Sequence, residues 1–128
     1  MKPVRIGLIG VGTVGASTAL VLKNNALEIG RRAGRSIEVI HASRRTISQG
    51  MPAGTEAIPL TADPFEIVNN PDVDIVVELI GGYEPALALV MKAIENGKHV
   101  VTANKALIAM HGNEIFAAAQ AKGVNVVF

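Results

Sequence analysis

Residues 4–15 read VRIGLIGVGTVG, and this stretch decides the fold. Its first six residues are a short apolar run that predicts a β-strand, and the residues that follow Gly15 have helical spacing. Gly10, Gly12 and Gly15 therefore form a G-x-G-x-x-G loop between a strand and a helix, the context in which this pattern indicates dinucleotide binding. Gly10 would make the tight turn, Gly12 would let the backbone approach a pyrophosphate, and Gly15 would let the helix pack closely on the strand.

The start of the following helix, predicted over residues 13–24, adds to this interpretation. A helix N-terminus presents unpaired N–H groups and a partial positive charge to phosphates, so we expect Thr13 and Val14 to join the glycines in binding the cofactor. A glycine-rich turn without a ligand is the alternative, because the chain has 13 glycines. The strand before the loop and the amphipathic helix after it favour the nucleotide site.

The composition bounds the class of protein. A chain of 128 residues is one domain that is long enough to bury a core. Hydrophobic residues make up 49% of it, but it has only three Phe, one Tyr and no Trp, which suits parallel strands covered on both faces by helices. The formal net charge of +1, without a basic tract, gives no indication of a nucleic-acid or membrane partner.

The absence of cysteine excludes disulfides, thiolate catalysis and cysteine metal sites, and it fits a cytosolic protein. The N-terminus runs directly into the first predicted strand and leaves no room for a signal peptide. No apolar run approaches the roughly 20 residues that a membrane span requires. We therefore expect a soluble, cytoplasmic domain.

Strand-like and helix-like segments alternate along the chain. Besides 4–9, strands are expected over 37–42, 57–60 (at a sheet edge, because of its proline), 74–80, 99–102 and from 124 onwards. Besides 13–24, helices are expected over 63–69, 85–96, 106–110 and 113–122. This alternation predicts an α/β, Rossmann-type doubly wound, mostly parallel sheet with helices on both faces. Gly10, Gly81 and Thr102 would then lie along one carboxyl edge, where such sheets bind ligands.

The end of the second strand bears on the choice of cofactor. Domains that prefer NAD usually carry an acid there to hold the ribose 2′-hydroxyl, whereas arginine accommodates the 2′-phosphate of NADP. This chain has Ser43, Arg44, Arg45 and Thr46 instead, and two guanidiniums with two hydroxyls suit a phosphate. Ordinary loop arginines are the alternative. We expect NADP, with NADPH preferred over NADH, and Arg44 as the main contact because it is nearer the strand.

Two features after the fourth predicted strand are informative. Gly81 and Gly82 allow the backbone to approach a ligand closely, which suits the ribose or nicotinamide of the cofactor. Glu78 is a carboxylate within an apolar strand and needs a partner. It either accepts hydrogen bonds from neighbouring loop N–H groups or faces a substrate cavity.

Lys105 is the candidate for chemistry. Asn104 is a suitable N-cap, which places Lys105 in the first turn of a helix, where a cation opposes the helix dipole by up to ~1 kcal/mol. An anionic ligand or a proton transfer would explain an ammonium at this place, and a surface lysine is the alternative. His41, His99 and His111 show no metal spacing and no obvious carboxylate partner, so we expect structural histidines and no metal site.

Three stretches together resemble homoserine dehydrogenase, namely residues 6–15, 74–86 and 97–107, which read IGLIGVGTVG, DIVVELIGGYEPA and GKHVVTANKAL. The resemblance implies a reversible, NAD(P)-dependent interconversion of L-homoserine and L-aspartate 4-semialdehyde, in the route to threonine and methionine. It also implies that Lys105, in the Thr-Ala-Asn-Lys stretch with Thr102, lies beside the nicotinamide and substrate. Arg44 or Arg45 would contact the adenosine ribose or its phosphate.

The family continues into a substrate-binding and dimerisation domain, which holds the principal acid/base lysine. The resemblance therefore implies that residues 1–128 are a cofactor-binding domain, inactive alone, of a full-length homo-oligomer. A free-standing NAD(P)-sensing module is an alternative from another class. The cofactor domain of a related semialdehyde or dihydrodipicolinate reductase is a third interpretation, which explains Gly81–Gly82 and 102–105 less well.

Overall fold

The computed structural model describes residues 3–10, 31, 34–45, 50–51, 55–80 and 85–128. The strands in this part of the chain are β1 (Val4–Ile9), β2 (Ile37–Ser43), β3 (Leu60–Thr61), β4 (Ile75–Glu78), β5 (His99–Thr102) and β6 (Val126–Val127). The helices are α3 (Phe65–Val68), α4 (Ala86–Glu95) and α5 (Lys105–Lys122). The predicted helix over 13–24, the loop residues Gly12, Thr13, Val14 and Gly15, and the pair Gly81 and Gly82 lie outside the described residues.

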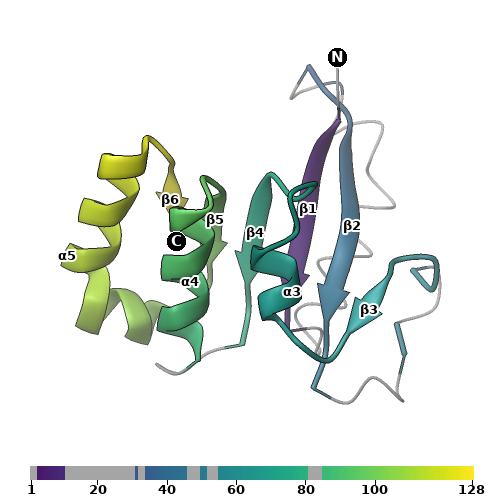
Figure 1. Cartoon of the computed structure of the whole chain (residues 1–128), viewed down its shortest axis with the longest axis horizontal. Coiled ribbons are helices and arrows are strands. Elements are labelled where there is room, and N and C mark those ends of the chain that lie inside the picture. Colours follow the sequence, from purple (N-terminus) through teal and green to yellow (C-terminus); the bar gives the residue numbers. More distant parts are fainter. Residues whose placement is uncertain (1–2, 11–30, 32–33, 46–49, 52–54, 81–84) are drawn as a thin grey trace.

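All the strands belong to one parallel sheet with the order β3-β2-β1-β4-β5-β6. This is the strand order of dinucleotide-binding doubly wound sheets, and it confirms the predicted fold class. The chain builds outward from β1 in one direction and then returns to build outward from β4 in the other (Figure 1). The neighbouring carboxyl ends of β1 and β4 therefore form the switch point at which such sheets bind ligands.

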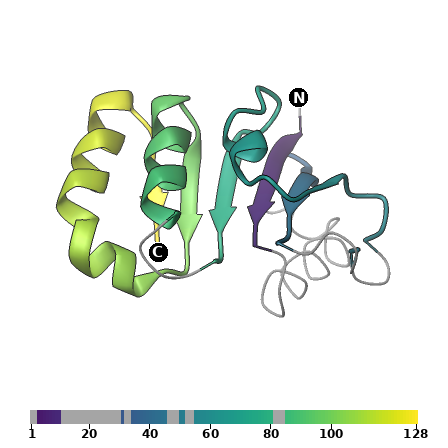
Figure 2. The same cartoon turned by 60° about the horizontal axis from the view of Figure 1, so that its bottom comes forward.

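Alternate side chains of the strands enter two separate cores. Ile9, Val76 and Val100 pack with residues of α3, α4 and α5 in the larger core. Leu8 and Val77 belong to a smaller cluster, because neighbouring residues of a strand point to opposite faces. The described helices thus cover one face of the sheet, and Figure 2 shows α4 and α5 side by side along β5. None of the described helices is long and apolar enough to cross a membrane.

The segment between β5 and β6 forms one long helix where two were predicted, over 106–110 and 113–122. α5 runs without interruption from Lys105 to Lys122, and Asn113, the expected cap of a second helix, lies in its interior. An interior glycine such as Gly112 costs only about 1 kcal/mol relative to alanine. The continued helical hydrogen bonds and the burial of Ile115 outweigh that cost. Asn104 does cap the helix as predicted, because its side chain accepts a hydrogen bond from the backbone N–H of Leu107 at 3.0 Å.

The third and fourth predicted strands are shorter than expected, and the last, expected from residue 124, is only Val126–Val127. The third is reduced to Leu60–Thr61 at the sheet edge, since Pro59 has no N–H and contributes only its carbonyl, which accepts from Ala42 N–H at 3.0 Å. The fourth ends at Glu78 instead of residue 80. There the Glu78 carboxylate accepts the backbone N–H of Ile80 at 2.7 Å, which turns the chain out of the ladder.

Candidate functional site

The carboxyl edge of the sheet gathers the described site residues. Gly10 follows β1 directly, Thr102 is the last residue of β5, and Lys105 begins α5 just beyond it. Because the strands are parallel and β1, β4 and β5 are neighbours, their carboxyl ends meet at one edge of the sheet (Figure 2). These residues therefore share that edge, as the sequence predicted. What they do there differs from residue to residue.

Gly10 makes the turn out of β1 in a conformation that only glycine adopts readily, with φ at +93°. A Cβ at this position would lie 2.5 Å from Cγ2 of Ile80, so the close approach also requires glycine. The Gly10 N–H donates to both the carbonyl and the hydroxyl oxygen of Ser43, each at 3.2 Å. The turn is therefore held between the end of β2 and the residues after β4.

Ser43 has a role that the sequence did not reveal. We expected its hydroxyl to suit a phosphate, but the side chain is buried and accepts a hydrogen bond from the Gly10 turn. Its position as the last residue of β2, next to the end of β1, is the signal that could have indicated this role.

A pocket of about 260 Å³ lies beside the Gly10 turn. It brings Gly10 together with both candidate arginines, and it is lined by Gly10, Ser43, Arg44, Arg45, Ala62, Pro64, Ile80 and Pro85. The Arg44 guanidinium is held at the pocket wall, where Nη1 donates to the carbonyl of Gly50 at 2.8 Å. The backbone N–H of Arg44 donates to the carbonyl of Thr61 at 3.0 Å. The pocket thus pairs a glycine turn with cationic side chains.

A buried polar chain occupies the ends of β4 and β5. Glu78 is fully buried, and one carboxylate oxygen accepts from Ile80 N–H while the other accepts from the Thr102 hydroxyl, each at 2.7 Å. The Thr102 oxygen accepts from Asn104 N–H at 3.0 Å, and the Asn104 side chain caps α5 at Leu107. Of the two roles foreseen for Glu78, acceptance from a loop N–H is confirmed.

Lys105 is the exposed first residue of α5. No carboxylate of the described residues lies within 4 Å of its amine, and Thr102 and Lys105 do not line the 260 Å³ pocket. The structure therefore divides the predicted site into two parts of the same edge. One part is at β1 and β2 with the arginines, and the other is at β5 with the lysine.

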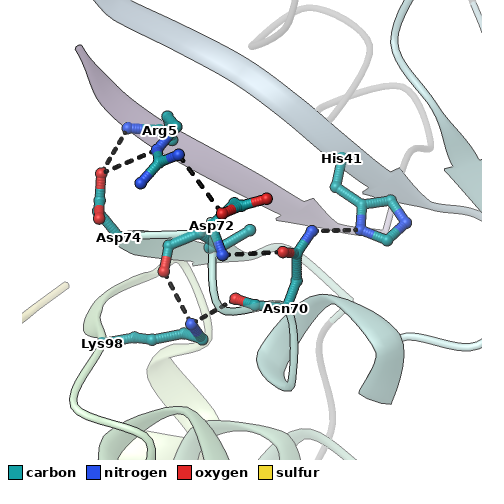
Figure 3. Close-up of polar contacts among 7 residues, drawn as sticks. Arg5, His41, Asn70, Asp72, Asp74 and Lys98 are labelled. Carbon is teal, nitrogen blue, oxygen red and sulfur yellow. Dashed lines mark hydrogen bonds and ion pairs between the residues drawn. The ribbon is translucent and has the colours of Figure 1, made fainter. Parts of the chain in front are cut away.

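A larger hollow of about 800 Å³ lies at the opposite, amino-terminal edge, between the starts of β1, β4 and β5. Its buried amine, Lys98, donates to the carbonyls of Asn70 at 2.6 Å and Val73 at 2.8 Å (Figure 3). Burial lowers the pKa of Lys98, and the nearby carboxylates Asp74 and Asp72 oppose that shift. Doubly wound sheets bind ligands at the carboxyl edge, so this hollow lies at the other edge from the candidate site.

The amino-terminal edge also holds an ion-pair cluster around Arg5. Its guanidinium lies 3.5 Å from Asp72 and 3.7 Å from Asp74, and Asp74 also accepts the Arg5 backbone N–H at 2.9 Å (Figure 3). Arg5 Nε is buried and makes no hydrogen bond with the described residues. Its carboxylate contact is the ion pair with Asp74 at 3.7 Å. These contacts join the starts of β1 and β4.

The histidines serve structural contacts. His41 meets the Asn70 amide at 3.2 Å, and His99 Nδ1 accepts from Asn125 N–H at 3.0 Å. The expectation that none has a carboxylate partner is wrong for His111, which pairs with Glu114 one helical turn away on α5. Among the described residues, no group of three or more acidic, histidine or cysteine side chains could hold a metal ion.

Comparison with known proteins gives a consistent result. Residues 10–128 match the family model described as the NAD-binding domain of homoserine dehydrogenase. The chain is 61% identical over its whole length to a homoserine dehydrogenase of Pseudomonas aeruginosa and 31% identical to that of Bacillus subtilis. It covers 29% and 30% of those two proteins, so it spans about a third or less of the relatives' length.

Solved structures agree with the sequences. A homoserine dehydrogenase from Thiobacillus denitrificans superimposes on the whole chain with a TM-score of 0.92 at 59% identity, and 30% of that protein is covered. The S. aureus enzyme superimposes equally well, with a TM-score of 0.92 at 36% identity and 32% of it covered. With the strand order and the glycine turn at the switch point, these matches show that the chain belongs to the family of homoserine dehydrogenase NAD-binding domains.

Proposed function

We propose that this chain is the dinucleotide-binding domain of a homoserine dehydrogenase, spanning residues 1–128. The full-length protein would interconvert L-homoserine and L-aspartate 4-semialdehyde by hydride transfer to and from NAD(P), in the cytoplasmic synthesis of threonine and methionine. The observation that carries the proposal is the pocket that joins Gly10 with Arg44 and Arg45 at the point where the strand order reverses. The substrate-binding and dimerisation part would lie in the remaining two thirds of the relatives' length.

The cofactor would extend along the carboxyl edge from β2 to β5. Its pyrophosphate would bind the backbone of the glycine loop, through Gly10, Gly12, Thr13, Val14 and Gly15. Its nicotinamide half would lie towards Gly81, Gly82, Thr102 and Lys105. The exposed amine of Lys105 would then be available to an anionic substrate group or to a proton transfer during hydride transfer.

We further propose that NADPH binds more tightly than NADH. No acidic residue stands directly after β2, where the sequence continues RRTISQG over residues 44–50. The guanidinium of Arg44 is held at the pocket wall by its bond to Gly50. A guanidinium held in place suits a 2′-phosphate, because its planar N–H groups match the phosphate oxygens and less conformational freedom is lost on binding. Arg45, the exposed neighbour at the same pocket, would add to the positive field.

Calorimetric titration of the chain with NADPH and with NADH tests both proposals. Loss of one charge-assisted hydrogen-bonding group costs about 1.5–3 kcal/mol, so Arg44→Ala should weaken NADPH binding by roughly 10- to 100-fold and NADH binding far less. Arg35→Ala, at the opposite edge of the sheet, is the matched control and should change neither affinity. Equal affinities of the native chain for the two cofactors would refute the preference, and binding of neither would refute the domain's role.

A further inference from the structure

We infer that Glu78 is a positioning residue, which sets the place of Lys105 through Thr102 and Asn104. The inference rests on the proposed function only for the role of Lys105 in substrate binding or proton transfer. The arrangement itself stands on the contacts at the ends of β4 and β5. Neither the family match nor the resemblance in sequence assigns a role to this carboxylate.

The first step is the direction of the hydrogen bond between Glu78 and Thr102. Their side-chain oxygens are 2.7 Å apart and both residues are buried, Glu78 fully and Thr102 to 2% exposure. The Thr102 oxygen also accepts from Asn104 N–H at 3.0 Å. Because the Thr102 hydroxyl donates to the Glu78 carboxylate, its hydrogen points at Glu78 and an oxygen lone pair faces the Asn104 N–H.

The second step is the start of α5. Ala103 N–H donates to the Glu78 carbonyl at 3.3 Å, so Glu78 holds the turn between β5 and α5 by its backbone as well as by its carboxylate. Asn104, placed by Thr102, caps the helix at Leu107 at 3.0 Å and itself retains 6% exposure. Lys105 follows directly, and its own N–H donates to Ala103 at 3.1 Å. The backbone that carries the amine is thus connected by hydrogen bonds to the buried side chains of Glu78, Thr102 and Asn104.

The third step is the other carboxylate oxygen, which accepts from Ile80 N–H at 2.7 Å. Ile80 lines the pocket beside Gly10, and a Cβ on Gly10 would meet it at 2.5 Å. One buried side chain therefore contacts both Ile80, which lines the pocket beside Gly10, and Thr102, which leads to the turn that carries the lysine. A change in Glu78 should disturb the relative placement of these two parts of the edge.

Two near-isosteric variants separate positioning from general stability. Glu78→Gln keeps the size of the side chain but cannot accept from both Ile80 and Thr102, because one of its two terminal atoms is an NH₂ donor. Thr102→Val removes the hydroxyl that links Glu78 to Asn104. Thr102→Ser keeps that hydroxyl and is the conservative control.

Hydrogen exchange of this chain gives the first readout. We expect the Leu107 amide to exchange at least 10-fold faster in Glu78→Gln and in Thr102→Val, and within 3-fold of native in Thr102→Ser. The Ile115 amide, in the middle of α5, should keep its native rate and shows that the helix is folded. Unchanged Leu107 exchange in folded variants would overturn the inference, whatever the protein's activity. If Glu78→Gln does not fold, the comparison of Thr102→Val with Thr102→Ser decides.

Turnover of the full-length enzyme gives the second readout. Thr102→Val should lower kcat at least 10-fold in the native background but less than 3-fold when Glu78→Gln is already present, because residues that act through one another are not additive. The KM for NADP in homoserine oxidation should change less than kcat in Thr102→Val. Effects that multiply in the double variant would overturn the inference. A native full-length protein without homoserine turnover would refute the proposed function and leave the exchange result standing.

Discussion

Gly10 is constrained twice, once by its own backbone and once by its neighbour. Its φ of +93° is unfavourable for any residue with a Cβ, and that Cβ would lie 2.5 Å from Ile80 Cγ2. Gly97, which follows α4, has a similar φ of +75° but nothing within 4 Å of the corresponding position. An alanine at either position would have to adopt an unfavourable positive φ. At Gly10, but not at Gly97, its methyl group would also clash with a neighbour.

This difference can be measured as unfolding free energy. Gly97→Ala should cost about 1–3 kcal/mol, the usual strain of an unfavourable backbone conformation. Gly10→Ala should cost roughly 1–3 kcal/mol more, because the added methyl overpacks against Ile80. Urea unfolding of both variants and of the native chain gives the two values. Equal costs would mean that Ile80 moves aside without penalty and that Gly10 is required only for its backbone.

At the scale of residues, the sequence predicted the features that depend on near neighbours. Gly10 and Asn104 were found because a glycine turn and a helix cap have local signals. Ser43 and the Glu78–Thr102 bond were missed or left open, since their partners are 33 and 24 positions away. Such contacts exist only once the strand order brings β1 beside β2 and β4 beside β5.

At the scale of elements, Lys98 links the segment between α3 and β4 to the start of β5 by hydrogen bonds. Lys98 donates to the carbonyls of Asn70 and Val73, and it is only 5% exposed (Figure 3). Lys98→Met keeps most of the apolar stem but removes this donor from both carbonyls. The Asn70 carbonyl still accepts from Val73 N–H at 3.1 Å, so the loss falls mainly on the Val73 carbonyl. An unsatisfied buried group costs about 1–3 kcal/mol, so the variant should be less stable at neutral pH by an amount in this range.

The cost of Lys98→Met should also depend on pH. Burial lowers the pKa of Lys98 below its ordinary value of 10.5, although Asp74 and Asp72 oppose the shift. Between the lowered pKa and 10.5 the unfolded chain binds more protons than the folded one, so the stability of the native chain rises with pH there through this group. The stability difference between native and Lys98→Met should therefore widen from pH 7 to pH 10. Lys92→Met, on α4, controls for the loss of one positive charge. A difference that is constant or narrows contradicts the role of burial.

The elements also show why boundaries are harder to predict than the presence of an element. Gly112 and Asn113 look like a helix end and a new cap, yet α5 continues through both. Their effects are local and amount to about 1 kcal/mol each, whereas packing of Leu107, Ile115 and Ala119 against the sheet stabilises the helix as one unit. The sequence shows the local signals but not the packing that overrides them.

For the molecule as a whole, alternation of strands and helices was enough to predict the parallel sheet and that Gly10 and Thr102 share its carboxyl edge. How far other residues cover each face of the sheet was harder to predict from the sequence. Runs of valine suggest strands buried on both faces, yet Val100 is 1% exposed while Val101 beside it is 39% exposed and Val127 is 56% exposed. Register places Val77, Val101 and Val127 in one row across β4, β5 and β6, and exposure increases along it from the 9% of Val77. Hydropathy alone cannot show where the cover of a sheet ends.

We expect this chain to bind NADPH but not to oxidise homoserine. The described carboxyl edge offers a glycine turn, a cationic pocket and an exposed lysine, but the chain spans about 30% of its homoserine dehydrogenase relatives. NADPH at 100 times its Kd should therefore stabilise the chain by about 2.7 kcal/mol, seen as a rise in Tm. The same chain with homoserine and NADP should form no NADPH, measured by absorbance, because the residues that hold the substrate would lie in the other two thirds of the enzyme. Homoserine-dependent NADPH formation by these 128 residues would place the whole reaction centre at this one sheet edge.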